Sequence, residues 1–134
     1  MTGFTAVLIY IAWTLALTML YAFPRVPQIL LGRKRADSWE RNQPSIDPVF
    51  MVRAKGAHLN CVENFPLFAG VVCVAALMNR SAVVDSVAAI FIAARLAQST
   101  AHLIGTNLPL IGLRATLFLV QVLLMFYMVW QLLH

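Results

Sequence analysis

The chain has 134 residues, of which 61% are hydrophobic and only 11% are charged. Soluble domains are about 45–50% apolar and about 25% charged, so this composition excludes an ordinary soluble domain. The net charge is +5, but the basic residues are concentrated in one connector, which is not the pattern of a nucleic-acid-binding surface. We interpret residues 1–134 as a single domain.

Four apolar stretches account for the composition: residues 4–23, 61–78, 82–104 and 108–133. Each approaches or exceeds the ~20 residues that cross ~30 Å of hydrocarbon as a helix. Backbone polar groups find no water in lipid, so each crossing must be helical. The sequence therefore predicts an all-α, integral membrane four-helix bundle with helices over residues 3–23, 49–79, 82–104 and 108–133.

We interpret the first helix as a retained membrane helix, because no Lys or Arg precedes it and no small-residue cleavage site follows it. Pro24 and Pro27 end or bend it. The polar connector over residues 25–48 carries five basic residues, Arg25, Arg33, Lys34, Arg35 and Arg41. By the positive-inside rule, the first and third connectors face the cytoplasm, and both termini face the opposite side.

The second predicted helix is about 46 Å long at 1.5 Å per residue, which is more than the bilayer core requires. Its first dozen residues carry charges, and we expect them to reach the headgroup region. Pro66 lies in its apolar part and frees the carbonyl of Val62, which predicts a bend. After the turn Gly105-Thr106-Asn107, Pro109 suits the first turn of the last helix.

Polar stripes appear on the second and third helices when residues are placed at 100° intervals. On the second helix the stripe consists of Arg53, Gly56, Asn60, Glu63 and Asn64. On the third helix it consists of Arg95, Gln98, Ser99 and His102, and the last helix adds Arg114 and Gln121. Lys55 and His58 point elsewhere, toward headgroups or solvent. We expect the stripes to converge in the cytoplasmic half of one bundle.

This convergence has a structural and a functional interpretation. Glu63 and Arg95 could form an ion pair that fixes helix packing, because an isolated charge at bilayer depth costs about 2.5–3.5 kcal/mol. If Glu63 pairs with Arg95, however, Arg53 and Arg114 have no acidic partner left in their stripes, and arginine pairs well with carboxylate ligands.

Cys61 and Cys73 are about 18 Å apart along one helix, too far to form a disulfide within the chain. Neither has a companion at metal-ligand spacing, so we interpret both as core residues and predict no metal site.

The motif Arg53-x-x-x-Ala57-His58-x-Asn60-x-x-Glu63-Asn64, followed by Pro66 and Phe68, resembles the second-helix signature of the MAPEG family, the membrane-associated proteins in eicosanoid and glutathione metabolism. The resemblance implies a homotrimer of four-helix protomers with sites between neighbouring protomers. Enzymatic members bind glutathione there and present its thiolate to a lipophilic small molecule that enters from the membrane lipid.

The resemblance also implies roles for individual residues. Arg114 is similar to the arginine that stabilises the thiolate, and is the candidate catalytic residue. The candidate glutathione-binding residues are Arg53, Asn60, Glu63, Arg95, His102 and Arg25.

Five positions depart from the pattern of the synthase-type members. Gly56 and Leu59 stand where those members have basic residues, His102 stands at a tyrosine position, and Ala115 and Phe118 replace hydroxyl-bearing residues. We interpret the chain as a divergent bacterial member of the inner membrane.

The predicted function is that of a glutathione-dependent transferase or peroxidase acting on lipophilic electrophiles. The alternative is a non-catalytic membrane module that binds a lipid or another anionic amphiphile in the same crevice, as one member of the family does. A transporter or channel is disfavoured, because the chain has no inverted repeat and few acidic residues in its helices.

Overall fold

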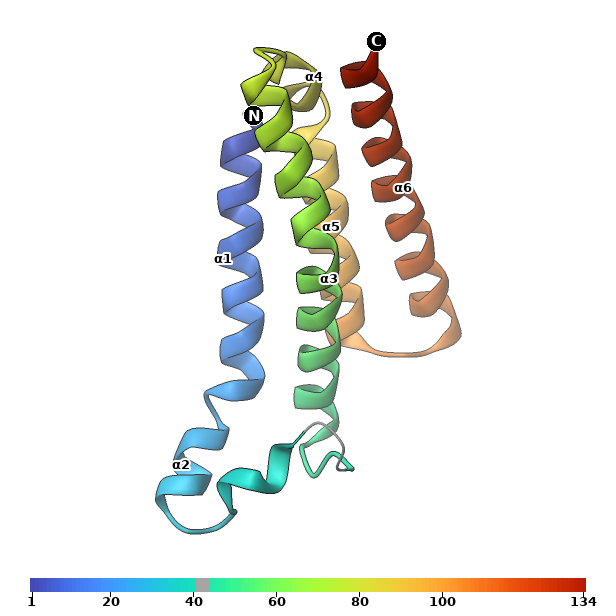
Figure 1. The fold of residues 1–134 in the computed structure, drawn as a ribbon. Coiled ribbons are helices and arrows are strands. Elements are labelled where there is room, and N and C mark those ends of the chain that lie inside the picture. The colour runs from blue at the N-terminus through green and yellow to red at the C-terminus, as the bar shows by residue number, and fades with distance from the viewer. Residues whose placement is uncertain (41–43) are drawn as a thin grey trace.

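The computed structural model describes residues 1–40 and 44–134, and this part of the chain is all-helical (Figure 1). Its helices are α1 (Gly3–Ala22), α2 (Arg25–Leu30), a 3₁₀ turn η1 (Ala36–Trp39), α3 (Val49–Leu77), α4 (Ser81–Asp85), α5 (Ala88–Ile104) and α6 (Leu108–Leu133). Arg41, one of the basic residues assigned to the first connector, lies outside the described residues.

The long helices α1, α3, α5 and α6 run side by side, with both chain termini and α4 at one end of the bundle (Figure 1). We call this the terminal end. The opposite end, which carries α2 and the loop between α5 and α6, is the connector end. Within the described residues, three segments are long and apolar enough to cross a membrane: Gly3–Leu30, Val49–Leu77 and Leu108–Leu133. The predicted all-α membrane bundle is therefore confirmed.

The third predicted helix, residues 82–104, is interrupted in the structure by a break after Asp85. The Ser86 hydroxyl donates to the carbonyl of Val83 at 2.7 Å, and the Val87 N–H bonds to Val84 in a tighter i→i−3 turn. A serine hydroxyl that satisfies a backbone carbonyl competes with the regular helical ladder. The regular part, α5, consequently has 17 residues and is about 25 Å long.

An aromatic cluster joins three of the helices in the core. Tyr10 of α1, Phe68 of α3 and Phe91 of α5 are each at most 2% exposed, and the rings of Phe68 and Phe91 stack at 4.1 Å. The Tyr10 hydroxyl donates to the carbonyl of Cys61, five residues before Pro66, at 3.0 Å. Through Pro66, α3 continues as a single helix. These contacts hold α1, α3 and α5 in one packed unit.

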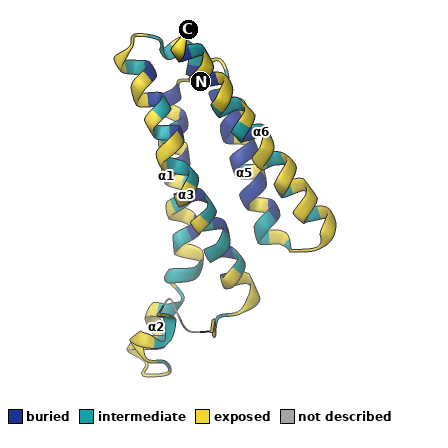
Figure 2. Cartoon of the chain, turned by 45° about the vertical axis from the view of Figure 1, so that its right-hand side comes forward, coloured by how far each residue is buried: buried dark blue, intermediate teal, exposed yellow. Residues whose placement is uncertain are grey.

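Large apolar side chains cover the outside of the bundle, and the buried residues lie on the inward faces (Figure 2). Leu8 and Leu15 of α1 and Phe126 of α6, for example, are more than 60% exposed. An apolar surface of this extent suits contact with lipid tails.

His58 of α3, which we expected to reach headgroups or solvent, packs against α1 and is half-buried. Its Nδ1 lies 3.0 Å from the hydroxyl oxygen of Thr18 and 3.3 Å from the carbonyl of Thr14. Its ring also lies 5.5 Å from that of Tyr21. Polar contacts of this kind link neighbouring helices where water is scarce.

Candidate functional site

Arg95 of α5 is the largest fully buried side chain and is 1% exposed. Its Nη1 donates to Oδ1 of Asn60 on α3 at 2.5 Å, and its guanidinium lies 5.4 Å from the ring centroid of Tyr10. Its Nε has no partner among the described residues. Amide, thiol and aromatic groups surround this buried cation, and no carboxylate of the described residues pairs with it.

The ion pair considered between Glu63 and Arg95 is not formed in the chain. The ion pairs in the described residues are Arg25–Asp47 and Arg35–Asp37, and Glu63 is exposed. Successive residues turn by 100°, so Glu63 lies about 60° around α3 from Asn60. That rotation is enough to leave the amide facing Arg95 and the carboxylate on the outer surface.

A second polar contact joins α5 to α6. Nε2 of Gln121 donates to Oε1 of Gln98 at 2.9 Å and to the carbonyl of Leu117 at 2.8 Å. Both glutamines are at least 94% buried. The sequence pattern places Gln121 among the converging polar residues without indicating its partner, although an amide in an otherwise apolar membrane helix signals an interhelical hydrogen bond.

Arg114 lines a cavity of about 260 Å³ between α3, α5 and α6. The cavity is bounded by Asn60, Gln98, Ile111, Arg114, Ala115 and Phe118. The Nε of Arg114 is buried and has no hydrogen-bond partner in the parts of the chain that the structure describes. We call this space the Arg114 crevice. Amides from two helices and an arginine from a third converge on it.

Arg53 and His102 lie near the connector end. Nη1 of Arg53 donates to the carbonyl of Ile104 at 3.1 Å, which caps the end of α5. His102 lies within electrostatic reach of both Arg114 and Arg53. The structure therefore places the imidazole of His102 near the guanidiniums of Arg53 and Arg114, and the two guanidiniums supply positive charge that suits an anion.

The sequence model of the MAPEG family matches residues 3–134, nearly the whole chain. The chain belongs to the MAPEG family. Comparisons with curated proteins and with solved structures find no match. The family predicted from the sequence is therefore confirmed. The chain is a membrane protein of the family associated with eicosanoid and glutathione metabolism.

Two departures from the MAPEG synthase pattern are neighbours in space. A Cβ atom added to Gly56 would lie 3.0 Å from Cε1 and 3.1 Å from Nε2 of His102. The imidazole therefore occupies the space beside α3 that a side chain at position 56 would need. Side chains at positions 56 and 102 therefore compete for the same space between α3 and α5.

The other departures change the walls of the site. Ala115 and Phe118 line the Arg114 crevice and bring no hydroxyl to it. Leu59 is 46% exposed and points to the outer surface of α3. Within one chain, this MAPEG protein consequently has fewer polar groups at the crevice than the synthase-type pattern implies.

Arg25 is not brought to the Arg114 crevice within one chain. Its Nη2 lies 2.5 Å from Oδ2 of Asp47, whose side chain is 2% exposed. Oδ1 of Asp47 also accepts from Nε1 of Trp39 at 2.8 Å, and the Arg25 guanidinium stacks over the rings of Tyr21 and Trp39. No sequence pattern indicates this partnership, because Asp47 is 22 residues from Arg25 and follows no helical spacing. Arg25 therefore ties the described part of the first connector to the end of α1.

Proposed function

We propose that this MAPEG protein is a glutathione-dependent transferase or peroxidase that acts on lipophilic electrophiles at the Arg114 crevice. The observation that carries the proposal is the position of Arg114, whose buried Nε has no partner in the described residues and which lines a cavity beside Asn60 and Gln98. An arginine in a partly dehydrated cavity stabilises a nearby anion more strongly than one in water.

The residues at the crevice fit glutathione by charge. The tripeptide carries two carboxylates, and the chain offers Arg53 and Arg114, neither of which has an acidic partner in the described residues. Glu63 is exposed on α3 and could accept from the amino group of a ligand on that surface. Arg95 would act indirectly, because its hydrogen bond fixes the position of the Asn60 amide.

Bound glutathione would supply the thiol whose thiolate attacks the electrophile. Arg114 would stabilise the thiolate by its positive charge, which favours the deprotonated form. Asn60 and His102 would orient the tripeptide, and the apolar outer wall at Phe118 would admit the electrophile from lipid. Orientation and charge stabilisation would supply most of the rate enhancement.

We further propose that the chain works as a homotrimer in the bacterial inner membrane, with the connector end in the cytoplasm. An exposed Glu63 supports this assembly, because an uncovered carboxylate within the bilayer costs about 2.5–3.5 kcal/mol. A neighbouring copy would cover that surface of α3.

The alternative is a non-catalytic membrane module that holds a lipid or another anionic amphiphile. The absence of hydroxyls at Ala115 and Phe118 on the crevice wall favours it. A module of this kind would bind its ligand without activating a thiol.

Calorimetric titration of glutathione into the purified protein, together with conjugation of a chlorodinitrobenzene-type electrophile, separates the two functions. We expect binding at millimolar glutathione and measurable conjugation, with both lost in Arg114→Ala. Arg33→Ala, which changes an exposed connector arginine, is the matched control and should keep both. If the wild-type protein does not bind glutathione, the proposed transferase is wrong.

A further inference from the structure

Exposed apolar side chains continue from the outer surface of α1 onto α2. Five of them are 48–79% exposed: Leu15, Met19, Phe23, Val26 and Leu30. They recur every three or four residues, so they lie within about 80° of one another around a helix axis. We call this surface the α1–α2 apolar face. It runs from the part of α1 that suits contact with lipid tails to the end of α2.

The α1–α2 apolar face is longer than the hydrocarbon core of a bilayer. Gly3–Leu30 is one apolar segment of 28 residues, about 42 Å at 1.5 Å per residue, whereas the hydrocarbon is about 30 Å thick. The 20 residues of α1 already cover that thickness, and Figure 1 shows α2 beyond the loop that joins α5 to α6. Pro24 separates the two helices, so α2 can take a direction of its own. The apolar residues of α2 therefore lie on the headgroup side of the hydrocarbon.

Three consecutive basic residues, Arg33-Lys34-Arg35, follow the apolar face after a tight turn. Gly32 has a left-handed backbone with φ 64°, and its N–H bonds to the carbonyl of Ile29 at 2.9 Å. The N–H of Arg33 bonds to the carbonyl of Gln28, also at 2.9 Å. This pair of bonds is the Schellman arrangement, which ends a helix at a left-handed residue. The turn therefore sets the cations directly beside the end of the apolar face.

Two of these cations have no acidic partner in the described residues. Arg35 pairs with Asp37 at 2.9 Å, whereas Arg33 is exposed and forms no ion pair in that part of the chain. Nζ of Lys34 lies 3.4 Å from a backbone carbonyl and 5.7 Å from the ring centroid of Trp39, and neither contact neutralises its charge. Each lysine or arginine near an anionic membrane surface contributes about 1 kcal/mol of attraction.

An anionic phospholipid surface matches both features. Exposed apolar patches mark sites of contact with a protein or a membrane. This patch, which ends at the exposed Leu30 and Leu31, is continuous with the surface of α1 that suits lipid tails, and this continuity favours the bilayer as the partner. A segment with an apolar face and basic residues beside it lies in the plane of the membrane interface. The unpaired cations add attraction for lipid phosphates.

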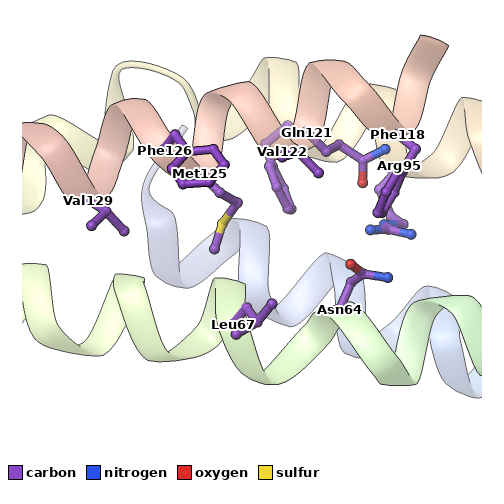
Figure 3. Close-up of a pocket in the computed structure, with 10 residues that line it drawn as sticks. Asn64, Leu67, Arg95, Phe118, Gln121, Val122, Met125, Phe126 and Val129 are labelled. Carbon is purple, nitrogen blue, oxygen red and sulfur yellow. The ribbon is translucent and has the colours of Figure 1, made fainter. Parts of the chain in front are cut away.

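We propose that residues 23–35 form an interfacial anchor that selects anionic phospholipids. Its apolar side chains insert beside the first carbons of the acyl chains, and Arg33 and Lys34 bind headgroup phosphates. None of these residues lines the Arg114 crevice or the cavity of about 280 Å³ between α3, α5 and α6, which is shown in Figure 3. The anchor requires no thiol chemistry, and so it does not depend on the proposed transferase activity.

The test places an environment-sensitive nitrobenzoxadiazole label on Leu30→Cys in the full-length protein. Cys73→Ser removes the exposed native thiol, and Cys61 is buried. The protein is compared in nanodiscs of phosphatidylcholine alone and with about one-third phosphatidylglycerol. We expect phosphatidylglycerol to increase quenching by a doxyl-labelled lipid about twofold and to shield the label from iodide. About 1 M salt should remove the difference, because the Debye length is then about 3 Å.

Variants of the basic residues test the recognition of charge. Arg33→Ser combined with Lys34→Ser should abolish the effect of phosphatidylglycerol on the label at position 30. Arg35→Ser is the matched control and should keep most of the effect, because Asp37 already offsets that charge. Arg114→Ala should also leave the effect unchanged, which distinguishes failure of the anchor from failure of the transferase.

Three results would overturn the proposal. The first is a label that iodide reaches and doxyl lipid does not quench, which would place α2 in water. The second is a label shielded from iodide but not quenched by lipid, which would show that another copy of the chain covers α2. The third is equal quenching with and without phosphatidylglycerol, which would show that Arg33 and Lys34 do not select anionic lipid. The lipid comparison retains all three basic residues, so it holds even if a serine variant fails to fold.

Discussion

The contact between Gly56 and His102 predicts that Gly56→Ala changes the free energy of unfolding differently when residue 102 is histidine and when it is alanine. A methyl group at position 56 would stand 3.0 Å from the His102 ring, closer than ordinary van der Waals contact. Overpacking of this kind costs about 1–3 kcal/mol. Alanine in a helix interior is more favourable than glycine by about 1 kcal/mol, which offsets part of this cost. Gly56→Ala should therefore be neutral or destabilise by up to about 2 kcal/mol.

The same substitution should stabilise the protein when His102 is alanine. The close contact is then absent, and only the helix-propensity gain of about 1 kcal/mol remains. The coupling free energy between positions 56 and 102 is thus expected to be about 1–3 kcal/mol. Gly70→Ala is the matched control on the same helix, because a Cβ there has no atom within 4 Å.

Equilibrium unfolding of the four proteins in mixed detergent micelles measures this coupling. A coupling below about 0.5 kcal/mol would show that the two positions behave independently. In that case, the space taken by the His102 imidazole would not explain why position 56 is glycine in this chain and basic in the synthase-type pattern. Glutathione titration of the same variants would then show whether His102 contributes to ligand binding.

Two further predictions concern the connector and the α5–α6 contact. Asp47→Ala should release Arg25 and speed tryptic cleavage of the first connector several-fold, as followed by gel electrophoresis. Asp37→Ala, which breaks an exposed ion pair, should have little effect on the cleavage rate. Equal cleavage rates in the two variants would show that the Arg25–Asp47 ion pair does not hold the connector in place. Gln121→Leu should destabilise the protein by about 0.5–2 kcal/mol in thermal unfolding, because it leaves the buried Gln98 amide unpaired. Adding Gln98→Leu should recover most of that loss, and no recovery would show that the two amides are not coupled.

The fold class and the membrane environment follow from the amino-acid sequence alone. Long apolar stretches force helices in lipid because no water is present to bond the backbone. The 3.6-residue period also placed Asn60 with Arg53 on one face of α3, and Arg95 with Gln98 on one face of α5. The family motif around Asn60 was readable for the same reason, since its residues recur at helical spacing.

Which of these residues become partners depends on how the helices pack against one another. A helical wheel gives the angle of each side chain about its own axis, but not the rotation or shift of one helix against another. The Arg95 guanidinium therefore meets the amide of Asn60 and not the carboxylate of Glu63, although the two lie one turn apart. Arg25 likewise pairs with Asp47, because the folding of a connector sets that contact and no periodicity does.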